Sequence, residues 1–175
     1  MDEAQWFRDQ LRSSADGFTW AVEQVPPERR RTAPPENLGE WPAIRHAYHM
    51  LSYERDIALP SMRQWLGGPK IEDEGFDDDS AWEREQDLDS ILARFRQVRA
   101  EQIALLAQFD PSHWGETRDT GWTRPEPWGG ITLRWVVTKT YQHTAEHTHD
   151  LLRLVLFWDF YAAKAREHSD AAAGE

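Results

Sequence analysis

The chain has 175 residues, with 20 Lys and Arg against 31 Asp and Glu, and its formal net charge is -11. Such a field repels nucleic-acid phosphates and anionic lipid, and no apolar stretch approaches the roughly 18 residues of a membrane span. Cysteine is absent, which excludes disulfides and thiolate ligands from this chain. We therefore expect a single cytoplasmic domain over residues 1–175, with no nucleic-acid or membrane partner.

Apolar residues recur at helical spacing in the first half of the chain. A first helix is expected at about 2–25, because Asp2 can cap its start and Pro26 stops the pattern. A second helix is expected at about 42–66, before two glycines and a proline. Pro60 lies inside this second run, so we expect a kink there.

Two more helices are expected in the second half. One spans about 81–109, where Ser80 and Glu83 fit a capping box. The other spans about 132–160, with Thr132 as its cap, and the alanine-rich tail beyond it is expected to fray.

No strand-like alternation competes with these helices, so the predicted fold is an all-α four-helix bundle. Its connectors are long for a simple up-and-down bundle. The second helix would cover about 36 Å, and residues 67–80 can span at most about 46 Å. That connector is long enough to run back along the bundle, which would leave the second and third helices parallel.

A pair of histidines on the last predicted helix carries the clearest chemical signal. His143 and His147 point about 40° apart on a helix, with Cβ atoms roughly 5 to 6 Å from each other. Two neutral imidazoles so placed can share one divalent metal ion. His149 points roughly 120° away from His143 and cannot join them. The structural alternative is that the pair is hydrogen-bonded or lies exposed at an end of the bundle.

An open metal site usually needs a third protein ligand, and the second predicted helix offers His46 and His49. The apolar centre of that helix lies about 130° from His49 and roughly 170° from His46. Projection on the helix therefore favours His49 only slightly. For either histidine, the alternative is a solvated side chain.

Other metal-site patterns fit less well. The segment from His143 to His147 reads H-x-x-E-H, a zinc-peptidase pattern, but that reading needs a further ligand well downstream. A di-iron bundle needs two E-x-x-H motifs, and Glu146 with His149 is the only such pair. The acidic run 72–79 lacks the spacing of a calcium loop and is expected to be solvated.

A family resemblance extends over nearly the whole chain. Trp41 is followed eight residues later by His49, a polar connector comes next, and Gly-Gly-Ile-Thr-Leu at 129–133 leads into a last helix with H-x-x-x-H. In these features the sequence resembles the DinB-like superfamily, which includes the YfiT-like proteins. Pro42 stands where that family usually has Ser or Thr, which affects the helix cap and not the ligands.

The resemblance implies an up-down-down-up bundle and frequent homodimers. It also implies a divalent metal, commonly zinc or nickel, held by His49, His143 and His147. An open coordination position would remain for water or a substrate group.

The resemblance further implies the type of activity, because family members include S-transferases that use a low-molecular-weight thiol. We expect a metal-activated thiol to attack a small electrophilic molecule. Weaker candidates for contacts to the substrate or to the ligands are Tyr53, Asp56, Glu146 and Asp150. The alternatives are a metal-dependent hydrolase that uses bound water, and a metal- or ligand-binding module without turnover.

Overall fold

The structure is a computed structural model that describes residues 2–71, 81–84, 87–121 and 130–173, with side chains as far as residue 168. The expected cap at Ser80 and the acidic run 72–79 lie outside the described residues. So does most of the loop before the last helix.

Helices make up most of the described chain, and the predicted all-α fold is confirmed. The four long segments are α1 (Glu3–Gln24), a composite helix, α5 (Leu88–Leu106) and α6 (Leu133–Ala173). The composite helix joins α2 (Ala43–Tyr53), η3 (Glu54–Ala58), α3 (Leu59–Arg63) and η4 (Gln64–Leu66). Short pieces are η1 (Pro27–Arg29), η2 (Glu36–Leu38), α4 (Ala81–Arg84) and η5 (His113–Gly115).

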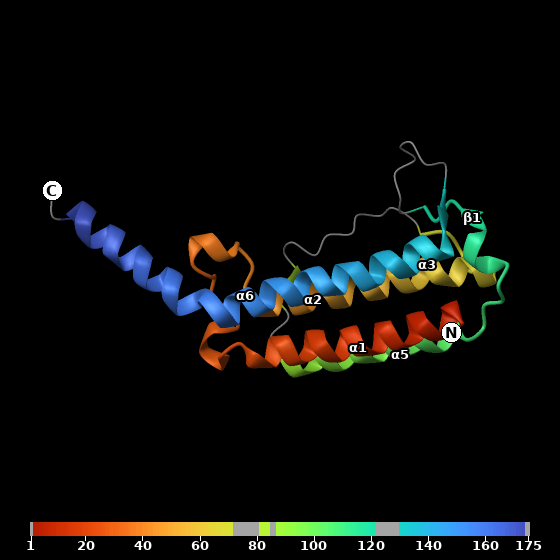
Figure 1. Cartoon of the computed structure of the whole chain (residues 1–175), viewed down its shortest axis with the longest axis horizontal. Coiled ribbons are helices and arrows are strands. Elements are labelled where there is room, and N and C mark those ends of the chain that lie inside the picture. Colours follow the sequence, from red (N-terminus) through yellow and green to blue (C-terminus); the bar gives the residue numbers. More distant parts are fainter. Residues whose placement is uncertain (1, 72–80, 85–86, 122–129, 174–175) are drawn as a thin grey trace.

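The long helices lie side by side (Figure 1). The composite helix runs in the same direction as α5, and both run opposite to α1 and α6. The helix α1 packs against both α6 and α5, and α2 packs against α5. Beyond the bundle, α6 continues as a projecting rod that ends at the C-terminus.

Two of the expected helix caps are present. The Asp2 carboxylate accepts from the backbone N–H of Ala4 at 3.4 Å, at the start of α1. The Thr132 hydroxyl accepts from the backbone N–H of Trp135 at 3.1 Å, at the start of α6. Each cap satisfies an N–H group that has no partner within its helix.

Other predicted boundaries were wrong. The helix expected at 81–109 is present as α4 and α5, because Asp87 caps a new start by accepting from the Asp89 N–H at 3.1 Å. The tail expected to fray continues α6 to Ala173, in keeping with the high helix propensity of alanine. A minimal strand pair, β1 (Thr117–Arg118) with β2 (Ile131–Thr132), was not expected.

The irregularity expected at Pro60 takes the form of a π turn, η3, directly before it. Proline has no N–H to donate, and its ring clashes with the carbonyl four residues back. A wider turn at Glu54–Ala58 lets the helix continue through this position.

The core consists mainly of two large apolar clusters separated by a polar layer, and a third, smaller cluster is formed by Tyr53, Ile57 and Ala58. One cluster includes Phe18, Met50 and Leu151, and the other includes Leu11, Met62 and Leu133. Between them lie three buried polar side chains, Glu54 in η3, Arg99 on α5 and Thr144 on α6, together with the half-buried Ser14 on α1. The layer crosses the whole bundle, so it links all the long helices.

Arg99 is the centre of this layer. It is 1% exposed, and its guanidinium donates to both carboxylate oxygens of Glu54, with Nε 3.0 Å from Oε2. It also donates to the Leu11 carbonyl at 3.0 Å and to the Ser14 hydroxyl at 3.1 Å. A further bond reaches the Thr144 hydroxyl at 2.8 Å. One side chain therefore bonds to partners on three other segments of the bundle.

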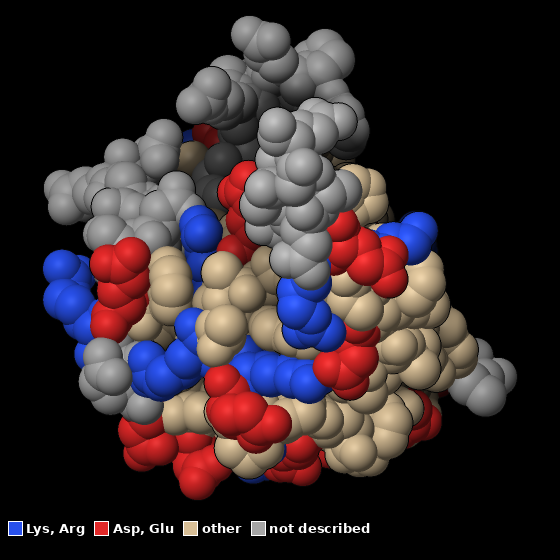
Figure 2. Space-filling view, turned by 90° about the vertical axis from the view of Figure 1, so that its left-hand side faces the viewer, with Lys and Arg blue, Asp and Glu red and all other residues tan. Residues whose placement is uncertain are grey.

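Exposed ion pairs lie on the surface of the bundle. Figure 2 views the end from which α6 projects, and basic and acidic side chains are interspersed there. One exposed pair joins Arg29 to Asp159 of α6 at 2.6 Å. No helix among the described residues is long and apolar enough to cross a membrane.

We predict that Arg99→Met lowers the free energy of unfolding by about 3–5 kcal/mol, because it leaves the buried Glu54 carboxylate unpaired. The matched control is Arg96→Met on the same helix, which removes an exposed pair with Glu23 at 3.2 Å and should cost less than about 1 kcal/mol. Urea denaturation followed by circular dichroism measures both values. Equal losses in the two variants would contradict a special role for the buried pair.

Candidate metal centre

Three histidines from two helices converge on one point. His49 lies on α2, and His143 and His147 lie one turn apart on α6. The Nε2 atom of His143 is 3.1 Å from the Nε2 of His49 and 3.1 Å from the Nε2 of His147. The ring centroids form a nearly regular triangle with sides of 5.0, 4.7 and 4.9 Å. The two histidines that lie four residues apart on α6 thus face the His49 ring of α2 across the helix interface.

The cluster is partly shielded from water, and this determines its charge. Desolvation lowers the pKa of His143 to about 3 and that of His147 to about 2, with a further lowering from neighbouring histidines. Both rings are therefore neutral at neutral pH. Each keeps a lone pair on one ring nitrogen, which is the form that binds a metal.

The three nitrogens cannot all satisfy one another by hydrogen bonds. A ring nitrogen carries either one hydrogen or one lone pair in the ring plane. The Nε2 atom of His143 has two such neighbours, at 3.1 Å each, and can serve only one of them well. A cation placed between the rings would receive a lone pair from all three. The donor set therefore fits a divalent metal that prefers imidazole nitrogen.

Aromatic rings surround the cluster. The Trp41 ring stacks on the His147 ring, with the two ring centroids 5.7 Å apart and an interplanar angle of 11°. The Arg45 guanidinium lies 4.4 Å from the centroid of the Trp41 ring, so this ring contacts Arg45 as well as His147. The rings of Tyr53 and His143 pack edge to face, with their centroids 4.3 Å apart. These contacts limit how far the imidazoles can rotate.

A comparison with protein families identifies the chain at this point. The DinB superfamily model matches residues 10–151, which include all three histidines. The chain belongs to the DinB superfamily. No curated protein and no solved structure gives a match. For this DinB protein, the structure and the family both point to a possible metal site at the histidine cluster.

The four weaker candidates from the sequence lie in different places. Tyr53 is buried against His143, and burial raises the pKa of its hydroxyl, so the group stays protonated. Asp150 belongs to a second group of possible ligands, with His46 and His147. Asp56 is exposed and bonds to Arg55 at 2.6 Å. Glu146 is also exposed and pairs with its own helix, so neither of these two carboxylates contacts the cluster through a described interaction.

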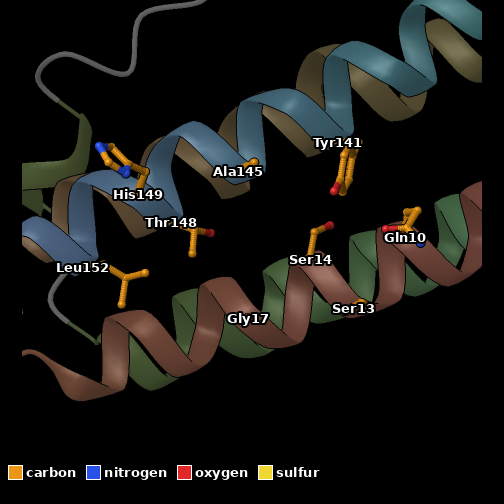
Figure 3. Close-up of a pocket in the computed structure, with 9 residues that line it drawn as sticks. All are labelled: Gln10, Ser13, Ser14, Gly17, Tyr141, Ala145, Thr148, His149 and Leu152. Carbon is orange, nitrogen blue, oxygen red and sulfur yellow. The ribbon is translucent and has the colours of Figure 1, made fainter.

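His149 lies on another side of α6, as the helical spacing predicted. Figure 3 shows it lining a pocket between α1 and α6, together with Ser14, Tyr141 and Thr148. This pocket has a volume of about 310 Å³. None of the three clustered histidines lines it.

Sequence reasoning considered His46 only as a rival of His49 for the third ligand position, whereas the structure places it beside the cluster. His46 is buried, and its Nδ1 atom lies 2.8 Å from the Nδ1 of His147. The available signal was its position three residues before His49, which puts both side chains near the same side of α2. Helical projection alone treated His46 and His49 as competitors, whereas the structure uses both.

We predict that the wild-type protein takes up one zinc ion per chain and that His143→Ala weakens its affinity by more than about 100-fold. The loss of a ligand should exceed the roughly 10- to 100-fold cost of losing a group that only supports a ligand. The matched control, His149→Ala on the same helix, should bind zinc like the wild type. Elemental analysis and isothermal titration calorimetry on untagged protein measure both. Equal zinc affinity in the two variants would exclude His143 as a ligand.

Proposed function

We propose that this DinB protein is a metal-dependent S-transferase, in which His49, His143 and His147 hold a divalent zinc or nickel ion. In its reaction the sulfur of a low-molecular-weight thiol would lose its proton and form a bond to a small electrophilic molecule, from which a leaving group such as chloride departs with the bonding electron pair. The observation that carries the proposal is the convergence of three imidazoles within reach of one ion.

A bound divalent ion would lower the pKa of a coordinated thiol, so that the thiolate is present near neutral pH. The residues of the chain supply the rest of the site. Histidine binds a metal as the neutral imidazole, so three such ligands would leave the positive charge of the ion uncompensated. Trp41 and Tyr53 pack around the rings and keep water away from them. Tyr53 retains its proton, so it can donate a hydrogen bond and does not serve as a base.

The thiol is proposed as an external reactant for two reasons. The chain contains no cysteine and so has no thiol of its own. The family resemblance also implies enzymes that use a cellular thiol as a co-substrate.

A small substrate is supported by the pocket next to the cluster. A cavity of about 360 Å³ is lined by residues that include Trp41, His46, His147, Asp150 and Arg153. This volume suits a compact molecule. Its wall combines an aromatic ring with charges of both signs, so a polar ligand with an apolar part would match it.

The proposal is tested with zinc- or nickel-loaded protein and a chromogenic aryl halide such as 1-chloro-2,4-dinitrobenzene. Product formation is followed with and without glutathione or another cellular thiol. We expect turnover that requires both the metal and the thiol. His143→Ala should reduce the rate to that of the mixture without protein, whereas His149→Ala should leave it unchanged.

The controls separate this activity from its rivals. Turnover of ester substrates by the metal-loaded protein without a thiol would identify a hydrolase instead. Metal binding with no turnover on a broad panel of electrophiles would support a binding module.

We also propose that the protein forms a homodimer through the projecting part of α6. Large apolar side chains are exposed there, with Leu156 70% and Phe160 54% accessible. The two residues are four apart, so they lie on one side of the rod. A continuous exposed apolar face is typical of an interaction surface.

Light scattering coupled to gel filtration tests this assembly. Phe160→Lys should shift the mass from that of two chains to that of one, because a buried lysine without a partner is costly. Leu66→Lys is the control, since Leu66 is exposed but lies at the end of η4. A monomeric wild type would refute the dimer and leave the proposed metal site unaffected.

A further inference from the structure

His147 uses both of its ring nitrogens. Its Nε2 atom faces the Nε2 of His143 at 3.1 Å, inside the proposed metal site. Its Nδ1 atom lies 2.8 Å from the Nδ1 of His46, on the other side of the ring. His46 is only 6% exposed, so water does not compete strongly for this contact.

This contact restricts which nitrogen of His147 carries the hydrogen. A nitrogen that binds a metal must present a lone pair, so a neutral His147 that binds through Nε2 carries its hydrogen on Nδ1. That hydrogen points to His46, whose Nδ1 must then accept it. The reverse arrangement, with His46 donating, would put the His147 hydrogen on the ligand nitrogen and block it.

The surroundings of His46 favour the arrangement in which it accepts. The backbone of Trp41 also hydrogen-bonds to the His46 side chain, and a carbonyl can only accept. Because the Nδ1 of His46 faces His147, a hydrogen held toward Trp41 on the other ring nitrogen would leave this Nδ1 with its lone pair. The resulting order is the Trp41 carbonyl, then His46, then the Nδ1–H of His147.

The other ligand on α6 has no such support. The Nδ1 atom of His143 is buried and has no hydrogen-bond partner among the described residues. Its ring instead packs edge to face with that of Tyr53. His147 is thus the ligand whose orientation and tautomer are set by a hydrogen bond, and Trp41 stacks on its face as well.

We propose that His46 is a positioning residue, which fixes His147 as the tautomer that offers Nε2 to the metal. The inference rests on the metal site of the proposed function and adds a fourth histidine that does not bind the ion. Ligating histidines usually donate their second N–H to a carboxylate, a carbonyl or water. In this chain the acceptor is a second imidazole, that of His46.

A competing reading is that His46, His147 and Asp150 hold an ion of their own, since one ligand atom of each lies within 4.8 Å of the others. The 2.8 Å separation of the two Nδ1 atoms is a hydrogen-bond length, and Asp150 also has an ion-pair partner, Arg153, at 3.9 Å. These contacts favour the hydrogen bond. The metal stoichiometry distinguishes the two readings.

The test compares His46→Phe, which keeps a ring but removes the acceptor, with His46→Gln, whose amide oxygen can accept from His147. Zinc affinity is measured by competition with a chromogenic chelator, and cobalt spectra report the ligand geometry. We expect one ion per chain throughout and an affinity about 10- to 100-fold lower in His46→Phe. His46→Gln should recover most of this loss.

A second measurement does not depend on the metal. Long-range ¹H–¹⁵N NMR of the histidine rings reports which nitrogen of His147 is protonated in the metal-free protein. We expect the Nδ1–H form in the wild type and in His46→Gln, and a mixture of forms in His46→Phe. Circular dichroism establishes that each variant is folded, and His46→Leu replaces the Phe variant if that one is not.

The outcomes distinguish this inference from the proposed function. Unchanged zinc affinity and an unchanged cobalt spectrum in His46→Phe would overturn the positioning role and leave the metal site standing. Two ions per chain in the wild type, falling to one in Asp150→Asn, would overturn it in favour of a second site. A wild type that binds no zinc, nickel or cobalt would overturn both proposals, even if NMR shows that His46 sets the tautomer of His147.

Discussion

The buried pair of Arg99 and Glu54 is the interaction on which the arrangement of the helices depends. A guanidinium at 1% exposure is stable only if its donors are satisfied, and its partners come from α1, η3 and α6. Two of those partners are neighbours of the site in sequence: Glu54 follows Tyr53, and Thr144 follows His143. The pair thus fixes the spacing between the two helices that carry the clustered histidines.

The histidine cluster depends on a second physical constraint, the charge of its closely spaced rings. His46, His143 and His147 lie close together without ionising, because burial lowers their pKa values to about 4, about 3 and about 2. Mutual repulsion of protonated rings acts in the same direction. A neutral cluster of this kind is rich in lone pairs and poor in hydrogens, which makes it a better host for a cation than for an anion.

The sequence predicted the four long helices, two of their caps and the i,i+4 pair on α6, because these depend on local spacing. Helical projection left open whether His49 or His46 meets that pair, and only the family resemblance selected His49. The π turn explains this, since it takes up about one more residue than an α turn and shifts all later positions by roughly 100°. An apolar centre averaged across η3 is therefore displaced. The Arg99 network could not be predicted either, since its partners are far apart in sequence.

The π turn also divides the composite helix into two parts that pack against largely different neighbours. Before it, α2 presents His46 and His49 to α6 and packs into one apolar cluster. After it, Leu59 still packs into that cluster, whereas Met62 and Trp65 pack into the other. Because the turn sets the rotation between these two parts, the contacts of one part do not have to follow the same helical repeat as those of the other. The one additional residue in the π turn thus lets the part that carries the histidines and the part that packs into the second cluster be oriented separately within one continuous helix.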